Sequence, residues 1–344
     1  MSDDPALDSL SFAFDSGALR WPTKAPVLFL RARVGAALSA ERRGALRCAQ
    51  SFKPMADDLQ RQGYAFAGDD EQNFPLTLVL PSRQRDEARA LFAAAVRRTA
   101  VGGIVLASQA NNEGARSGES DLSELLGDVA SLSKNHCRVY WGRVPNAARE
   151  SGLLRQWLEL DAPRPIGDGR FLSRPGVFSW DRVDAGSALL AEHLPSGSTG
   201  RAADLGAGWG YLSAQLLARN PDIASLDLYE AEARALSLAE RNLAGEASRV
   251  ALAFHWHDVA QGLPSKYDII ISNPPFHVGR ADLPELGRAF IAAAARALNP
   301  GGRFWMVANR HLAYEQAMAQ HFSDVRTLVV RDGFKVIEAS GARA

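Results

Sequence analysis

"GRAADLGAGWGYLSAQLLARN", residues 200–220, reads as an apolar strand, a turn with three glycines and a helix. Within it, Asp204, Gly206, Gly208 and Gly210 form a D-x-G-x-G-x-G pattern. Glycines let the backbone turn tightly and approach a ligand closely, and the helix that follows has unpaired N–H groups in its first turn. A plain glycine-rich turn is the alternative, because the spacing differs from the dinucleotide-binding pattern G-x-G-x-x-G. The stretch predicts a strand–turn–helix unit with a candidate ligand site at the turn.

The chain continues this alternation of strands and helices. Short apolar segments separated by helices of about ten to fifteen residues are typical of an α/β fold with a doubly wound, mostly parallel sheet. Ligands on such sheets bind at the carboxyl ends of the strands, so functional residues are expected just after strands. The predicted strands are "SLDLYEA" (225–231), "VALAFHW" (250–256) and "YDIIISN" (267–273), and the predicted helices are "YLSAQLLARN" (211–220) and "EARALSLAERNLAG" (232–245).

The two halves of the chain resemble each other. "RALFAAAVRRTAVGG" (89–103) and "RAFIAAAARALNPGG" (288–302) are identical at eight of fifteen positions without a gap. In both, we expect an Ala-rich helix that ends in Gly-Gly and is followed by an apolar strand. Ala is the best helix former, so coincidence is the alternative, but the ordered match favours duplication. The sequence thus predicts two tandem Rossmann-like domains.

A cluster of prolines and glycines between residues 163 and 176 marks the boundary between the halves. Such clusters are typical of an inter-domain crossing, and 344 residues are more than one typical core needs. We place the boundary near residue 165, which gives domains 1–165 and 166–344.

The composition narrows the class of protein. Lys and Arg number 39 and Asp and Glu also number 39, so no basic excess announces a nucleic-acid partner, although a local patch stays open. The two cysteines, Cys48 and Cys137, form no disulfide framework or zinc pattern, and we expect no metal. No apolar run reaches the roughly 18 residues that span a bilayer, and the acidic start does not look like a signal peptide. We expect a cytoplasmic protein without a membrane partner.

Acidic residues follow two of the predicted strands. Glu230 stands at the tip of "SLDLYE", 24 residues after Gly206, where it can accept hydrogen bonds from a ribose diol. Asp258, after "FHWH", is placed to receive the amino group of an adenine. The alternatives are a solvated acid for Glu230 and a turn or cap residue for Asp258.

The strand "YDIIIS" ends in Asn273, Pro274, Pro275 and Phe276. The Asn273 side-chain oxygen and the Pro274 carbonyl can each accept one hydrogen of a planar amino group, and the prolines stiffen the turn. Phe276 offers a face on which a flat substrate can stack. A simple Asn-Pro turn is the alternative.

Such an acceptor pair solves a chemical problem. An amine conjugated to a ring is a poor nucleophile, because its lone pair is delocalised. Two acceptors that draw its hydrogens out of the plane favour a tetrahedral nitrogen that can attack an electrophilic methyl in line. Positioning and electrostatics then supply most of the catalysis, and no strong base is needed.

These motifs, in this order on successive strands, resemble class I S-adenosylmethionine-dependent methyltransferases. "RPGVFSWDRVDAGSALLAEHLP", "NPPFH", "ANRHLAYE" and "GFKVIEA" are more specifically similar to the bacterial ribosomal RNA guanine-N2 methyltransferases, which include a small-subunit methyltransferase C and its large-subunit relative. The resemblance implies S-adenosylmethionine as cofactor and a guanine N2 amine of ribosomal RNA as target, in 16S rather than 23S RNA. It also implies a degenerate methyltransferase-like N-terminal half.

The resemblance assigns roles residue by residue. It implies cofactor roles for the glycine turn, Glu230 and Asp258, and target-amine roles for Asn273, Pro274 and Phe276. Phe178 and Asp184 match the segment before the glycine turn and would help close the cofactor site, although Phe178 is as readily a core residue.

The first half lacks these features. "VLFLRARVG" and "LPSRQ" stand where the second half has "DLGAGWG" and "SNPPF", so we expect residues 1–165 to bind no cofactor and to act as a scaffold or RNA-docking domain. The candidate phosphate contacts are Arg83, Arg85, Arg89, Arg97 and Arg98.

Other functions stay open at this stage. "NPPF" fits an enzyme that methylates a protein glutamine or an adenine equally well. A noncatalytic ribosome-assembly protein is the alternative from another class, and the intact glycine turn and Asn273 argue against it. We expect a monomer.

Overall fold

A computed structural model describes residues 4–35, 40–275, 277–278, 281–282 and 284–343. The chain divides into two compact units. The first comprises Met1–Ala162 with Arg174–Gly176, and the second comprises Pro163–Ser173 with Val177–Ala344. Each unit is built around its own seven-stranded sheet.

The sheet of the second unit has the strand order β12-β11-β10-β13-β16-β18-β17. Its first five strands are parallel, and β18 runs antiparallel to both β16 and β17. This confirms the prediction of a mostly parallel α/β sheet. Its strands are β10 (Gly200–Leu205), β11 (Ile223–Glu230), β12 (Ala251–Trp256), β13 (Tyr267–Ser272), β16 (Leu298–Asn309), β17 (Phe322–Arg331) and β18 (Phe334–Ala342).

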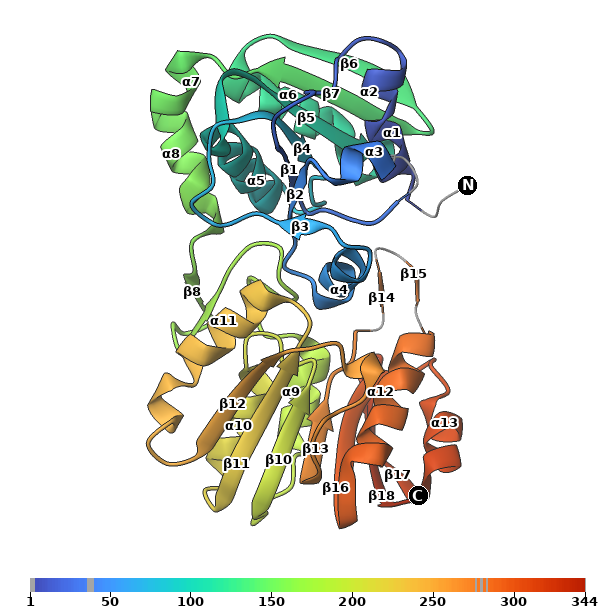
Figure 1. Ribbon diagram of the computed structural model, residues 1–344. Helices are drawn as coiled ribbons and strands as arrows, with labels where there is room; N and C mark the ends of the chain where they lie inside the picture. The colour runs from blue at the N-terminus through green and yellow to red at the C-terminus, as the bar shows by residue number, and fades with distance from the viewer. Residues whose placement is uncertain (1–3, 36–39, 276, 279–280, 283, 344) are drawn as a thin grey trace. The chain divides into compact units, whose positions relative to one another are not determined.

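Helices cover both faces of this sheet. Ile269 and Ile271 of β13 pack into one apolar cluster with α9, α10 and α11, while Ile270 faces a second cluster with α12 and α13. This alternation explains the continuous apolar run "IIIS", because a strand buried on both faces needs no polar side. Figure 1 shows α12 and α13 in front of the strands. The helices are α9 (Ala185–Glu192), α10 (Tyr211–Arg219), α11 (Ala233–Asn242), α12 (Pro284–Ala297) and α13 (Tyr314–His321).

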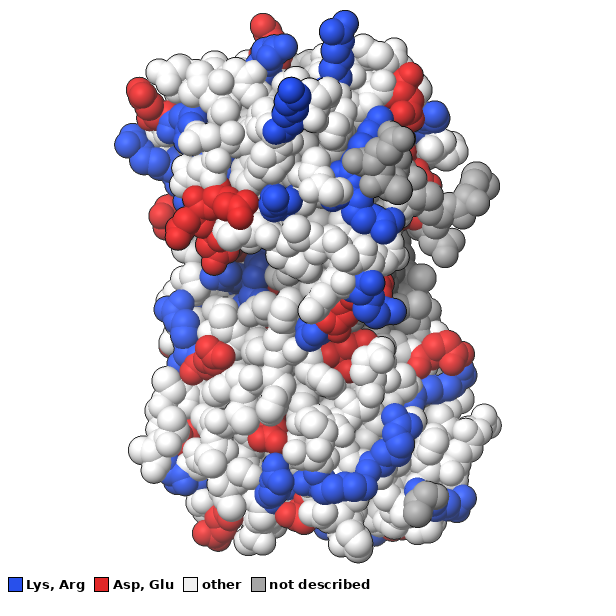
Figure 2. Space-filling model, in the orientation of Figure 1, with Lys and Arg blue, Asp and Glu red and all other residues white. Residues whose placement is uncertain are grey.

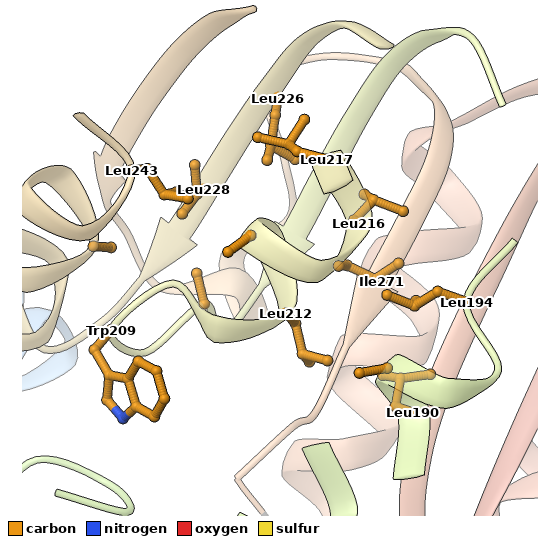
Figure 3. Close-up of a cluster of buried hydrophobic side chains, with 14 of the residues drawn as sticks. Leu190, Leu194, Trp209, Leu212, Leu216, Leu217, Leu226, Leu228, Leu243 and Ile271 are labelled. Carbon is orange, nitrogen blue, oxygen red and sulfur yellow. The ribbon is translucent and has the colours of Figure 1, made fainter. Parts of the chain in front are cut away.

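The first of these clusters anchors the helix after the glycine turn. Leu216 and Leu217 of α10 are buried against the sheet, and Trp209 of the turn lies at the edge of the same cluster (Figure 3). The turn is therefore held between a buried strand and a buried helix. Shorter elements complete the unit: β8 (Arg164–Ile166), β9 (Phe171–Ser173), β14 (His277–Val278), β15 (Ala281–Asp282), η3 (Ala244–Glu246) and η4 (Val259–Gln261).

The sheet of the first unit has the equivalent strand order, β3-β2-β1-β4-β5-β7-β6, with the same parallel and antiparallel neighbours. Its strands are β1 (Val27–Leu30), β2 (Leu46–Ala49), β3 (Ala65–Phe66), β4 (Phe74–Val79), β5 (Thr99–Ala110), β6 (Val129–Lys134) and β7 (Cys137–Arg143). Its helices are α1 (Pro5–Leu10), α2 (Phe12–Asp15), α3 (Ala40–Arg43), α4 (Lys53–Arg61), α5 (Arg85–Arg98), η1 (Asn111–Glu113), α6 (Ala115–Leu126), α7 (Asn146–Glu150), α8 (Gly152–Leu158) and η2 (Glu159–Asp161).

The repeated Gly-Gly pairs lie elsewhere than expected. The helices end at Arg98 and Ala297, and each Gly-Gly pair falls inside the strand that follows, β5 or β16. Gly102 and Gly301 have φ of 78° and 81°, and the register of each strand shifts nearby. The pairs therefore kink two strands rather than end two helices.

Candidate active site

Four parallel strands of the second unit end at the same edge of the sheet. Leu205 of β10 pairs with Tyr229 of β11 and with Ser272 of β13, and Glu230 pairs with Trp256 of β12. The Ser272 hydroxyl also donates to the Leu205 carbonyl at 2.7 Å, which ties the ends of β13 and β10 together. The glycine turn, Glu230, Asp258 and Asn273 are thereby gathered along one edge.

The three glycines of the turn all have positive φ, at 74°, 56° and 87° for Gly206, Gly208 and Gly210. Their surroundings differ. A Cβ atom on Gly206 would lie 3.4 Å from Phe290, and one on Gly210 would lie 3.3 Å from Ala239, whereas one on Gly208 would meet nothing within 4 Å. Gly208 is therefore the position at which the turn leaves room for a ligand.

Glu230 holds this turn in place. Its Oε2 accepts a hydrogen bond from the Gly208 N–H at 2.7 Å, and its Oε1 accepts one from the Glu232 N–H at 2.7 Å. Burial raises the pKa of the Glu230 carboxyl above its ordinary value, although both backbone donors act in the opposite direction. Each carboxylate oxygen has a second lone pair, so a hydroxyl donor can still bind.

Asp204 lies beneath the turn and is fully buried. Its Oδ2 accepts a hydrogen bond from the Ser213 hydroxyl at 2.8 Å, while its Oδ1 has no hydrogen-bond partner among the described residues. Burial raises the pKa of the Asp204 carboxyl to about 7, and the Glu230 carboxylate adds to the rise.

Asp258 caps the short helix η4. Its Oδ1 accepts from the Ala260 N–H at 3.0 Å, and its Oδ2 accepts from Gln261 Nε2 at 3.3 Å. The cap interpretation of this residue is thus realised. Asp258 is half-buried, so its carboxylate is still accessible to a ligand. Its contact with a ligand amino group stays a prediction.

A hollow of about 390 Å³, part of it open to solvent, lies beside the glycine turn. It brings together four of the candidate positions from distant parts of the sequence: Phe178, Asp184, the glycine turn and Asn273. Phe178 is 66% exposed, and its carbonyl accepts from Trp209 Nε1 at 3.3 Å. The lining residues are Phe178, Ser179, Asp184, Ser187, Gly206, Ala207, Gly208, Trp209, Tyr211, Leu212 and Asn273.

Asn273 makes two hydrogen bonds within this hollow. Its Nδ2 donates to Asp184 Oδ2 at 3.0 Å and to the Ser187 hydroxyl oxygen at 2.8 Å. Pro274 is buried and Pro275 is exposed, while Phe276 lies outside the described residues. The stacking role predicted for Phe276 therefore stays a prediction.

Sequence reasoning missed part of this lining. Ser187, Trp209 and Tyr211 carried no motif of their own. Trp209 and Tyr211 form an aromatic cluster with Phe171, with ring centroids 5.2 to 5.8 Å apart. The signal for Ser187 was present, since it stands three residues after Asp184, the spacing of a residue whose N–H is bonded by a helix N-cap.

Comparison with known proteins identifies the family. Residues 168–338 match a family model described as a methyltransferase small domain. A ribosomal RNA small subunit methyltransferase C of Shewanella loihica is 30% identical over 266 residues, which cover 77% of this chain and 77% of that protein. The chain belongs to the ribosomal RNA small subunit methyltransferase C family. The family resemblance inferred from the sequence is confirmed.

Two further members of methyltransferase C type agree. One from Pseudomonas aeruginosa is 34% identical over 211 residues, which cover 60% of this chain and 61% of that protein. A solved structure described as the T. thermophilus 16S rRNA N2 G1207 methyltransferase in complex with AdoMet and guanosine has a TM-score of 0.79 and 25% identity. It covers 98% of this chain and 92% of its own, so the likeness extends over both units.

In this member of the methyltransferase C family, the strand ends of the first unit carry different residues from those of the second unit. Leu30 pairs with Ala49 as Leu205 pairs with Tyr229, so Gln50 stands at the counterpart of Glu230. Gln50 Nε2 donates to the Ala32 carbonyl at 2.7 Å, and its Oε1 accepts from the Phe52 N–H at 2.9 Å. Gln50 therefore accepts from the N–H two residues ahead, as Glu230 does, but it donates to a carbonyl where Glu230 accepts from the Gly208 N–H.

No described helix is long and apolar enough to cross a membrane. The described ranges also contain no group of three or more His, Cys, Asp or Glu residues arranged to hold a metal ion.

Proposed function

We propose that this protein transfers a methyl group from S-adenosylmethionine to the exocyclic N2 amine of a guanine in 16S ribosomal RNA. Its membership of the methyltransferase C family supports the reaction class. The observation that carries the proposal is Asn273, whose amide nitrogen is held by Asp184 and Ser187 beside the glycine turn. Among the described residues, none donates a hydrogen bond to Asn273 Oδ1, so this oxygen is available as an acceptor.

The residues in and around the glycine turn fit S-adenosylmethionine. Gly208 leaves open space beside the turn, and Glu230 keeps acceptor capacity for ribose hydroxyls. Asp204, fully buried and bonded to the Ser213 hydroxyl, ties the same turn to α10 from beneath. When bound, the cofactor supplies an electrophilic methyl group on a sulfonium sulfur.

The chain's own part is to prepare the amine. Asn273 Oδ1 and the Pro274 carbonyl each accept one hydrogen of the guanine amino group, which moves the nitrogen lone pair out of the ring plane. The lone pair then points away from the two acceptors, toward the incoming methyl. This preset arrangement stabilises the transition state without a covalent intermediate on the protein.

Asn273→Ala tests this role directly. We expect turnover to fall by about two to three orders of magnitude, as when a preorganised polar group is lost from an active site. Cofactor affinity should stay unchanged, because Asn273 acts on the amine. Steady-state kinetics and calorimetric titration measure the two quantities, and unchanged turnover would contradict the role.

We further propose that the first unit is a degenerate copy without a cofactor site, which serves as a scaffold or an RNA-docking domain. Gln50 in the place of Glu230 supports this. Basic and acidic side chains are mixed over the face drawn in Figure 2, and we assign the RNA contact to local arginines. Arg85 and Arg89 both contact Asp121, which leaves them less free for phosphate.

The phosphate-contact prediction is wrong for Arg98. This residue is only 9% exposed, and its guanidinium donates to the carbonyls of Glu71 and Gly68. Arg98 therefore closes a loop of the first unit. The other candidates, Arg83 and Arg97 among them, stay predictions, as do a monomeric state and a cytoplasmic location.

Labelled methyl transfer to four acceptors offered side by side tests the function. The acceptors are small ribosomal subunits, large subunits, protein-free ribosomal RNA and a glutamine-bearing translation factor. We expect transfer to the small subunit or its RNA. Transfer only to the protein would replace guanine by glutamine as the target, and transfer to none would overturn the proposed substrate.

A further inference from the structure

The Asp184 carboxylate decides which way the Asn273 amide faces. The amide can be turned by 180° with little change in shape, so its orientation depends on its partners. An ionised carboxylate accepts hydrogen bonds and donates none, so only the NH₂ end of Asn273 can face Asp184 Oδ2, 3.0 Å away. The oxygen Oδ1 must then point to the other side.

Ser187 completes the arrangement. Its hydroxyl oxygen lies 2.8 Å from Asn273 Nδ2, so both hydrogens of the amide have an acceptor. The hydroxyl alone could not fix the orientation, because it can donate as well as accept. The Ser187 backbone N–H also donates to Asp184 Oδ2 at 2.7 Å, which makes Asp184 the N-cap of α9 and holds the carboxylate in position.

We infer that Asp184 and Ser187 are positioning residues that orient Asn273, so that its carbonyl oxygen rather than its NH₂ group meets the amine to be methylated. This inference rests on the proposed function. An Asn273 amide turned the other way would present a donor to a donor and would repel the amine. The three side chains come from α9 and the end of β13, 86 to 89 residues apart, and they line the same hollow.

Single substitutions separate orientation from helix capping. Asp184→Ala removes the acceptor, and we expect kcat at saturating cofactor to fall about 10- to 100-fold with the KM for RNA within about twofold. Asp184→Asn keeps an oxygen that can cap α9 and accept from Asn273, so kcat should stay within about threefold of the wild type. Ser187→Ala leaves the cap intact, because the cap uses the backbone N–H, and should lower kcat about threefold.

Ser151→Ala is the matched control. Ser151 caps α8 in the first unit by accepting from the Leu154 N–H at 3.0 Å, as Asp184 caps α9. It should lose a helix cap without loss of kcat. An equal fall of kcat in Ser151→Ala and Asp184→Ala would overturn the inference, since lost stability would then explain both. A fall in Asp184→Asn as deep as in Asp184→Ala would also overturn it.

A paired exchange gives the sharpest readout. In N273D two carboxylates face each other across about 3 Å and repel, so this variant should be nearly inactive. Adding D184N removes one of the two negative charges while its amide oxygen keeps the cap on the Ser187 N–H, and the carboxylate at position 273 still has an oxygen that serves as acceptor. We expect D184N/N273D to be about 10-fold more active than N273D, whereas purely structural roles predict equal activity.

A measurement without substrate keeps the inference testable if the proposed function fails. The side-chain NH₂ signal of Asn273, assigned by its absence in N273D, should exchange with solvent at least about 10-fold more slowly in the full-length wild type than in D184A/S187A. Equal exchange would overturn the positioning role. Slow exchange in a wild type that methylates no acceptor would support the positioning role and overturn only the proposed function.

Discussion

Gly206, Gly208 and Gly210 all have positive φ, but a side chain would have different consequences at each residue. Only at Gly208 would an added Cβ atom enter empty space beside the hollow. The D-x-G-x-G-x-G pattern thus combines two packing glycines with one that admits a ligand.

Gly208→Ala should weaken S-adenosylmethionine binding at least about 10-fold, because the methyl group enters space that the ligand needs. It also imposes about 1–2 kcal/mol of backbone strain at φ 56°. Gly197→Ala is the matched control, with φ 69° and nothing within 4 Å of the added Cβ. Thermal unfolding should show similar destabilisation for both variants. Calorimetric titration should show weaker cofactor binding only for Gly208→Ala, and equal cofactor Kd values would contradict the ligand role of Gly208.

The buried Asp204 carboxyl predicts a pH-dependent stability. Its folded-state pKa of about 7 lies above the ordinary value of about 4, so the folded protein holds the proton more tightly than the unfolded chain. The stability that this group contributes below about pH 4 is lost as the pH rises from about 4 to about 7, at a cost of about 2–4 kcal/mol.

Asp204→Asn should remove this loss, because the amide does not titrate. Denaturant unfolding of both proteins between pH 5 and pH 8 measures the difference in slope. Since all other residues are the same in both proteins, their contribution cancels in the comparison. Parallel stability curves would show that Asp204 has an ordinary pKa.

At the scale of elements, the close packing of α12 and α13 depends on Gly287. A Cβ atom there would lie 2.1 Å from the Tyr314 hydroxyl oxygen, and Tyr314 is 2% exposed, so its ring cannot swing into solvent. Gly287→Ala should therefore destabilise the protein by about 1–3 kcal/mol, although Ala is the better helix former.

The control is Gly152→Ala in α8, where an added Cβ atom meets nothing within 4 Å. It should leave stability unchanged or raise it by up to about 1 kcal/mol. Chemical denaturation compares the two variants. If Gly287→Ala were as stable as Gly152→Ala, α12 and α13 could move apart without loss of stability, and their close packing would not depend on Gly287.

The sequence predicted the elements that build the site but not the contacts between them. Strands read from apolar runs, together with a parallel sheet, were enough to bring the glycine turn, Glu230 and Asn273 to one edge. The partners of Asn273 escaped prediction, because Asp184 and Ser187 lie 86 to 89 residues away on α9, which precedes the sheet. Periodicity identifies the buried face of such a helix, but it does not say which strand end its N-terminus meets.

Sequence reasoning left a cap role and a ligand role open for Asp258, because capping depends on local φ and ψ angles rather than on residue type alone. The cap is present, and the ligand role stays a prediction. The Gly-Gly pairs were placed at helix ends, where glycine is common, but they occupy kinks within β5 and β16.

At the scale of the whole molecule, two sheets with the same strand order have different residues at the carboxyl ends of their strands. The second unit presents Glu230 and the glycine turn, and the first presents Gln50 bonded to the Ala32 carbonyl. Two units with the same strand order need not bind the same ligand, since function depends on the residues at the strand ends.

Cofactor titration of the whole chain tests this asymmetry. We expect one equivalent of S-adenosylmethionine per chain, with binding weakened by Gly208→Ala and unaffected by Gln50→Ala. A second equivalent, or a loss of binding in Gln50→Ala, would show that the first unit also holds cofactor.

The central claim is that the methylated atom is N2 of a guanine in 16S ribosomal RNA. After reaction of the full-length protein with small ribosomal subunits lacking the modification, the RNA is digested to nucleosides and analysed by mass spectrometry. We expect about one equivalent of N2-methylguanosine per 16S molecule with the wild type and none with Asn273→Ala. A different methylated nucleoside, or N2-methylguanosine confined to 23S RNA, would contradict the claim.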